Sequence, residues 1–191
     1  MKKAIRLVIV GAVLAALILG YYYSLSNRQS PGEDKKKLTE YDKIVSYDLK
    51  KNYPETPRGV VKWYDRIISE YYAKKHSDSQ IEKLSDKTRL LFDSALLERN
   101  PVDSYHESVK ADVRDWKKRK ALIITTDECS SNDVRYATVN GDDVAYVTAY
   151  YYVKNGKNYE KTFEEFCLRK SDNRWKILTW RKINGDEADF N

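Results

Sequence analysis

The chain has 191 residues and carries 35 Lys or Arg against 29 Asp or Glu, which gives a formal net charge of +6. With 41% hydrophobic residues, 7 Gly and 4 Pro, the composition excludes a collagen, a low-complexity scaffold and a chain that is disordered throughout. Two cysteines exclude a disulfide-dense mini-protein. Most of the positive excess precedes residue 55, so the rest of the chain is near neutral and we expect no nucleic-acid partner.

An apolar run close to the N-terminus predicts a membrane anchor. Residues 7–25 would form a helix about 28 Å long, close to the roughly 30 Å hydrocarbon core of a bilayer. Tyr21, Tyr22 and Tyr23 fall where an aromatic belt would meet the headgroups, and the basic residues of segment 1–6 favour a cytoplasmic N-terminus. We therefore expect a single-pass protein of the cell membrane, with residues 1–6 in the cytoplasm and the C-terminal domain outside.

A cleaved signal peptide is the alternative for this segment, because it shares the basic start and the apolar core. Cleavage after Gly20 would place Ile18 at the minus-three position, where a small residue is usual, so we favour an uncleaved anchor. Residues 26–37 are polar and contain Pro31 and Gly32, which predicts a flexible linker.

Helical spacing of apolar residues begins after the linker. A short lead-in helix is indicated by Leu38, Tyr41, Val45 and Leu49. Thr56 and Pro57 suit the cap and first position of a longer helix. Asp65 and Glu70 fall off its apolar stripe, so we expect both in solvent. The stripe itself consists of Val60, Tyr64, Ile67 and Tyr71.

Two more helices are predicted before the strands begin. Ser79 with Glu82 indicates a capping box for the second helix, and Ser104 with Glu107 opens the third. Beyond Lys120 the hydrophobic period changes to two, and Asn140-Gly141, Asn155-Gly156 and Asp172-Asn173 mark tight turns between successive antiparallel strands. The expected strands are residues 121–126, 134–139, 144–154, 159–170 and 174–183.

Helices followed by an antiparallel meander predict an α+β domain over residues 38–184, with a C-terminal tail at 185–191. The last strand, Arg174-Trp175-Lys176-Ile177, and this order of elements resemble the cystatin-type cone of the NTF2-like (SnoaL-like) superfamily. The runs 53–61, 91–92 and 100–101 also resemble an uncharacterised family of single-span, membrane-anchored proteins of Gram-positive bacteria. The resemblance implies three helices packed on a curved antiparallel sheet. It implies no single function, because the superfamily hosts enzymes, ligand carriers, dimerisation modules and secretion-system parts.

The sequence offers no recognisable catalytic, cofactor-binding or metal-binding set. His76 and His106 lie near helix ends, where we expect them to face solvent, and no Asp is spaced to form a dyad with either. No metal-ligand spacing occurs, so we expect no cofactor and no metal. A disulfide between Cys129 and Cys167 is left open, because spacing alone cannot supply its geometry.

Aromatic residues supply the remaining candidates. A cavity inside the cone would be lined by Trp63, Tyr64, Tyr71 and Trp175. The alternating pattern of the third strand places a second aromatic set on the other face of the sheet, where a homodimer or an envelope partner could bind. That set is Tyr146, Tyr150 and Tyr152, with Trp180 from the last strand. Tyrosines on a hydrated sheet face explain the same pattern equally well.

We expect a membrane-anchored, extracytoplasmic module that acts by binding, as a homodimer or as an accessory part of an envelope complex, for example in conjugation or type IV secretion. The alternative is a small-ligand carrier or SnoaL-like enzyme that uses the cone. It requires an enclosed cavity with converging polar groups.

Overall fold

The computed structural model describes residue 21, residues 37–73 and residues 76–188. The segments expected to be a cytoplasmic tail, a membrane helix and a linker, 1–6, 7–25 and 26–37, lie outside these ranges apart from Tyr21 and Lys37. Within the described ranges, no helix combines the length and the apolar character needed to cross a bilayer. The chain divides into two units, residues 1–38 and 39–191, and the architecture below is that of the second.

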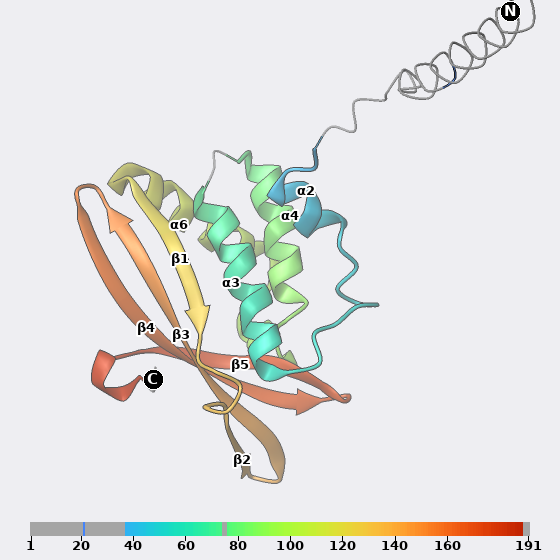
Figure 1. Ribbon diagram of the computed structural model, residues 1–191. Coiled ribbons are helices and arrows are strands. Elements are labelled where there is room, and N and C mark those ends of the chain that lie inside the picture. The colour runs from blue at the N-terminus through green and yellow to red at the C-terminus, as the bar shows by residue number, and fades with distance from the viewer. Residues whose placement is uncertain (1–20, 22–36, 74–75, 189–191) are drawn as a thin grey trace, which may run out of the picture. The chain divides into compact units, whose positions relative to one another are not determined.

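The second unit is an α+β domain in which helices precede strands (Figure 1). Its helices are α2 (Glu40–Ser46), α3 (Pro57–Ala73), α4 (Asp78–Arg89), α5 (Ser94–Arg99) and α6 (Val102–Arg119). Its strands are β1 (Ala121–Glu128), β2 (Arg135–Val139), β3 (Asp142–Asn155), β4 (Asn158–Ser171) and β5 (Arg174–Ile183), followed by the 3-10 turn η1 (Gly185–Glu187). In Figure 1 the helices lie on one side of the twisted sheet, with α3 beside β1.

Helix α3 begins where the sequence predicts it. The N–H of Gly59 donates to the Thr56 hydroxyl at 3.1 Å, and Pro57 occupies the first turn, where its missing N–H costs nothing. The predicted stripe is buried against the sheet and the other helices. Asp65 and Glu70 are buried as well, which contradicts the expectation of a solvated position for both.

The caps of two helices differ from the predicted ones. Helix α4 is capped by Ser77, whose hydroxyl accepts from the N–H of Gln80 while the Gln80 side chain accepts from the N–H of Ser77. The predicted box of Ser79 and Glu82 is therefore wrong by two residues, because the helix begins earlier. Helix α6 starts at Val102, and the Ser104 hydroxyl donates to the carbonyl of Pro101 instead of capping the helix.

A short extended segment separates α4 from α5 and adds to the sheet. The Asp93 N–H donates to the Ile177 carbonyl, and the Ile177 N–H donates to the Leu91 carbonyl, both at 2.8 Å. Asp93 then caps α5 by accepting from the Ala95 N–H at 2.9 Å. This pairing, rather than a continuous second helix, buries Leu91 and Phe92 in the core.

Strand β3 organises the antiparallel sheet. One edge of β3 pairs with β4 at residues 144–155. The other edge pairs with β1 at residues 149–155 and with β2 at residues 142–146. The predicted neighbours β2–β3, β3–β4 and β4–β5 are confirmed. Strands β1 and β2 are not neighbours, because they share one edge of the longer β3. Positive φ angles at Asn140, Gly141, Asp172 and Asn173 confirm two of the predicted tight turns.

A bulge in β5 changes which face its aromatic residues occupy. Cys167 pairs with Thr179 and Leu168 pairs with Ile177, which leaves Leu178 as the extra residue. Ile177 and Trp180 therefore point to the same, helix-covered face. The expectation that Trp180 lies on the opposite, partner-binding face is wrong, because simple alternation does not account for a bulge.

Substituting Ser77, the observed cap of α4, and Ser79, the expected one, tests which residue caps the helix. We expect Ser77→Ala to lower the free energy of unfolding by about 1 kcal/mol, because it removes the acceptor of the Gln80 N–H. Urea denaturation of the full chain in detergent, followed by tryptophan fluorescence, measures this change. The exposed Ser79→Ala is the matched control and is expected to stay within about 0.5 kcal/mol of the native chain. A larger loss for Ser79→Ala would contradict the observed cap.

Candidate functional site

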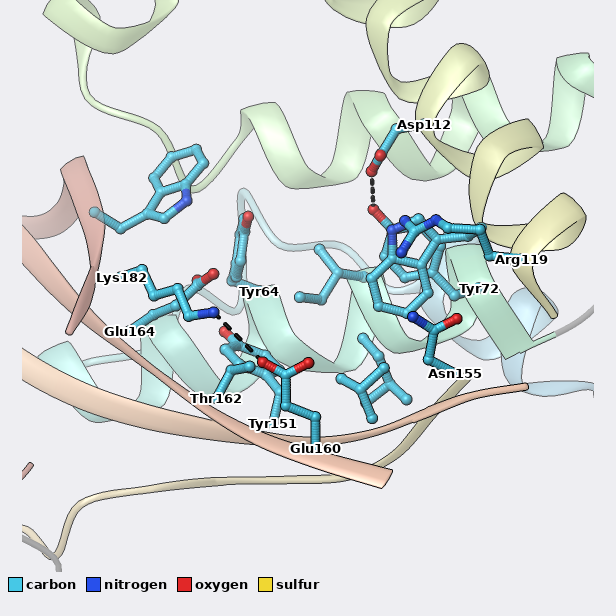
Figure 2. A pocket seen from close by; sticks show the side chains of 15 residues that line it. Tyr64, Tyr72, Asp112, Arg119, Tyr151, Asn155, Glu160, Thr162, Glu164 and Lys182 are labelled. Carbon is cyan, nitrogen blue, oxygen red and sulfur yellow. Dashed lines mark hydrogen bonds and ion pairs between the residues drawn. The ribbon is translucent and has the colours of Figure 1, made fainter. Parts of the chain in front are cut away.

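A pocket of about 430 Å³ opens between α3, α6 and the helix-facing side of the sheet (Figure 2). Side chains from α3 and α6 form one wall, and residues from β1, β3, β4 and β5 form the other. The lining residues of the described chain are Tyr64, Ile68, Tyr72, Asp112, Trp116, Arg119, Ile123, Tyr151, Val153, Asn155, Glu160, Thr162, Glu164, Trp180 and Lys182. This composition, aromatic with a few polar groups, is typical of a ligand site.

Aromatic contacts fix the two ends of the pocket. At one end the rings of Tyr64 and Trp180 lie 5.6 Å apart and are tilted by 51°. At the other end Tyr72 stacks on Trp116 with centroids 4.0 Å apart, and the Tyr72 hydroxyl donates to Asp112. Aromatic pairs of this kind contribute about 0.5–1.5 kcal/mol each beyond the area that they bury, so the walls are held in place without a ligand.

The charged residues that line the pocket differ in whether they have an ion-pair partner. Arg119 binds Asp115 at 2.8 Å and lies over the Trp116 ring, and Lys182 pairs with Glu160 at 3.5 Å. Glu164 forms no ion pair or hydrogen bond of its own with any described residue. Burial raises the pKa of Glu164, and Lys182, directly across the strand pair, opposes the rise.

A buried acid lies behind the Tyr151 wall of the pocket. The Tyr151 hydroxyl donates to Oδ1 of Asp65 at 2.6 Å, and Asp65 is 1% exposed. Burial raises the pKa of Asp65 well above its usual range, the bond from Tyr151 opposes the rise, and the neighbouring Glu128 adds to it. Oδ2 of Asp65 meets no hydrogen-bond donor among the described residues. The raised pKa favours the neutral, protonated form of Asp65.

Glu128 is the member of this acid pair whose charged form has the better support from neighbouring cations. Burial raises its pKa too, but Arg58 and Lys62 favour its charged form, and Arg58 Nη2 lies 3.3 Å from its carboxylate. Asp65 has no comparable cation among the described ion pairs. These surroundings favour a proton on Asp65 over one on Glu128.

Both histidines are partnered, contrary to the expectation that they face solvent. His76 is buried, with Nε2 3.1 Å from the Glu70 carbonyl and 3.2 Å from its carboxylate, and its ring lies against Tyr41 of α2. His106 Nε2 lies 2.9 Å from Asp86, so the expected absence of an Asp partner is also wrong. Packing of α6 against α4 brings Asp86 to His106, whereas His76 lies in the connection after α3 and reaches back to Glu70 of that helix. Neither histidine lines the pocket.

The predicted cavity residues are distributed over the domain. Tyr64 lines the pocket. Tyr71 is fully buried, with its hydroxyl 2.6 Å from that of Thr88. Trp63 contacts the Tyr47 ring and belongs to a separate hollow, and Trp175 lies beside Tyr136 at the far end of the sheet.

The predicted partner residues Tyr146, Tyr150 and Tyr152 alternate with the buried residues of β3 and occupy the face opposite the helices. Cations cover two of these rings, Arg135 over Tyr146 at 4.9 Å and Lys161 over Tyr150 at 4.1 Å. These cation contacts reduce the apolar area that the face offers to a partner.

Both cysteines are free, so they form no disulfide. Cys129 belongs to the buried core, whereas Cys167 pairs with Tyr146 on the opposite face of the sheet. Among the described residues, no group of three or more His, Cys, Asp or Glu is placed to hold a metal ion.

Sequence reasoning missed the acids at the pocket, although signals for them exist. Glu164 occupies the same register as the buried Phe166 and Leu168, so alternation alone places a carboxyl on the inward face of β4. Asp65 lies four residues after Val61 and three before Ile68, within the flank that widens the α3 stripe.

Fold and pocket define an α+β domain with a ligand-sized site between its helices and its sheet. The chain belongs to the family described as a domain of unknown function, DUF6715, whose model matches residues 1–180. No curated protein matches the chain. A solved structure of TraH, described as a transfer protein from the Gram-positive conjugative plasmid pIP501, matches 65% of this chain and 94% of its own at 13% identity, with a TM-score of 0.31.

The buried acid Asp65 predicts a pH dependence of stability. Its folded pKa lies above the unfolded value of about 3.9, so its protonated form stabilises the fold most at low pH, and this contribution is lost as the pH rises through the folded pKa. We expect Asp65→Asn, which stays neutral and still accepts from Tyr151, to flatten the loss of stability between about pH 5 and pH 9.

Urea denaturation across that pH range measures the effect. The exposed Asp143→Asn is the control and should keep the native pH profile. An unchanged profile for Asp65→Asn would show that Asp65 is ionised throughout the range.

Proposed function

We propose that this chain is a membrane-anchored, extracytoplasmic binding module and that the pocket between α3, α6 and the sheet is its binding site. The observation that carries the proposal is the pocket itself, about 430 Å³ with preformed aromatic walls and polar groups that converge on it. A site of this size takes a small ligand or one side chain of a protein partner.

Binding rather than catalysis is supported by the placement of the reactive side chains. The two histidines and the two cysteines of the chain are described, and none of them lines the pocket. Asp65, the buried acid of α3, lies behind Tyr151, whose hydroxyl already donates to it. Tyr151 thus fixes the pocket wall instead of donating to a ligand.

We also propose that the domain has the NTF2-like cone fold. This is supported by helices that cover one face of a twisted antiparallel sheet and by a pocket that opens between the two layers. A narrower form of the proposal is an accessory part of a conjugative or type IV secretion machine. It rests on the general architecture of anchored modules, and the genomic neighbourhood of the gene tests it.

The proposed topology is tested by thiol labelling in intact cells. We expect Lys157→Cys, in the exposed β3–β4 turn, to react with a membrane-impermeant maleimide, because residues 7–25 are proposed to place the domain outside. The substitution is made in a Cys167→Ser background. The remaining native thiol is that of Cys129, which is buried and should not react. Lys2→Cys is the control and should react only after lysis. Labelling of Lys2→Cys but not of Lys157→Cys in intact cells would show that the topology is the opposite of the proposed one.

The pocket is tested with 5-fluorotryptophan in the full chain. Trp116 and Trp180 line the pocket, whereas Trp63 and Trp175 lie elsewhere and serve as internal controls. We expect small-molecule fragments to shift the fluorine signals of Trp116 and Trp180 saturably, and Thr162→Phe, which fills the pocket, to abolish the shift. Fragments that shift only Trp63 or Trp175 would contradict the proposed binding site.

A further inference from the structure

One end of the pocket combines a carboxyl group with converging aromatic rings. Glu164 and Phe166 share the inward register of β4, and their cross-strand partners Lys182 and Trp180 share the inward register of β5. Tyr64 of α3 faces this group, with its ring 5.6 Å from that of Trp180. Figure 2 shows Tyr64, Glu164 and Lys182 on one side of the pocket, away from Asp112 and Arg119.

The rings at this end cannot rotate away from the pocket. Trp180 stacks on Phe166 at 6.1 Å and contacts Phe92 at 6.0 Å, while Tyr64 meets Phe166 edge-on at 5.3 Å. Phe92 and Phe166 are themselves buried in the core. The two lining rings therefore form a rigid corner beside Glu164.

We propose that this end of the pocket binds an organic ammonium group, with the Glu164 carboxylate as its counter-ion and the faces of Tyr64 and Trp180 as its aromatic walls. This inference rests on the proposed function, because it names the chemical class that the same pocket takes. Aromatic faces attract cations through their negative quadrupole, by about 0.5–2 kcal/mol per ring depending on desolvation.

The pairing of the other charges favours a cation over an anion. The lining cations already have acidic partners, Lys182 with Glu160 and Arg119 with Asp115. An anionic ligand would have to break those pairs and approach Glu164. An ammonium ligand instead supplies the partner that Glu164 lacks among the described residues.

The dimensions favour an organic cation over a metal ion. The pocket of about 430 Å³ far exceeds the volume of a bare ion, and the apolar side chains Ile68, Ile123 and Val153 are part of its lining. Divalent metals require several oxygen or nitrogen ligands at short distance, whereas this corner offers one carboxylate between aromatic rings. An alkyl chain on the ammonium group would bury its carbon atoms against the apolar residues.

Two sources carry the proposed group, a lysine side chain of a protein partner and a free or lipid-borne choline or ethanolamine. Their shared chemistry is the alkylammonium ion, and probes distinguish them. Choline presents a quaternary ammonium that meets the aromatic faces and attracts the carboxylate by charge alone, whereas Nα-acetyl-lysine amide presents a primary ammonium that also donates hydrogen bonds to the carboxylate.

The experiment titrates choline and Nα-acetyl-lysine amide into the full chain in a sugar-based detergent, which carries no ammonium group. Binding is read from the fluorine signal of 5-fluorotryptophan at position 180. The matched neutral probe is 3,3-dimethylbutan-1-ol, which has the shape of choline without its charge. We expect at least one cationic probe to bind at least about tenfold more tightly than the neutral one.

Two variants test the charges separately. Glu164→Gln should weaken binding of the cationic probes by about tenfold or more, and Lys182→Gln should strengthen it severalfold, because it removes the like charge across the strand pair. Glu98→Gln, which is exposed and does not line the pocket, should leave binding unchanged. The opposite directions of the first two effects separate charge recognition from a loss of folding.

The outcomes separate the two proposals. If neither cationic probe binds more tightly than the neutral alcohol, or if the cationic probes bind equally to the native chain and to Glu164→Gln, the ammonium proposal is overturned and the binding pocket is left intact. A Trp180 signal that moves with neither charged nor neutral probes overturns both.

Discussion

The packing of α3 against β3 is the constraint on which the site depends. Tyr151 spans the two layers, because its hydroxyl donates to Asp65 of α3 while its ring lines the pocket. A buried hydrogen bond of this kind contributes about 1 kcal/mol net, but breaking it would leave Asp65 without a donor and cost about 1–3 kcal/mol. The bond thus fixes the depth at which the sheet approaches the helix, and the space left beyond Tyr151 is the pocket.

Local sequence signals predict most of the fold. Helix α3, the β-hairpins and the burial of one face of β3 follow from spacing, turn residues and alternation, all of which act over a few neighbouring residues. The errors arise where contacts between segments far apart in the sequence determine the local structure. Leu91 and Asp93, on either side of Phe92, exchange backbone hydrogen bonds with Ile177 and so draw this segment onto the sheet. Trp180 changes face because of a bulge that only the pairing of β4 with β5 reveals.

The candidate site was less predictable for a physical reason. Sequence reasoning assigns an acidic residue to solvent, because an unpaired buried charge is costly. Burial favours the protonated form of Asp65, which reduces that cost, and Glu164 faces a pocket instead of the packed core. Both solutions depend on groups brought in from other elements, Tyr151 and Glu128 for the first and Lys182 for the second.

The two acids have different roles, because Asp65 supports the fold and Glu164 is placed to recognise a ligand. Asp65 is enclosed by protein groups, so a ligand cannot reach it. Glu164 is partly desolvated and lacks a protein partner of its own among the described residues, so a ligand group of opposite charge gains more there than it would on an open surface. The fold thereby places the Glu164 carboxylate at the aromatic end of the pocket, where a cationic ligand can bind it.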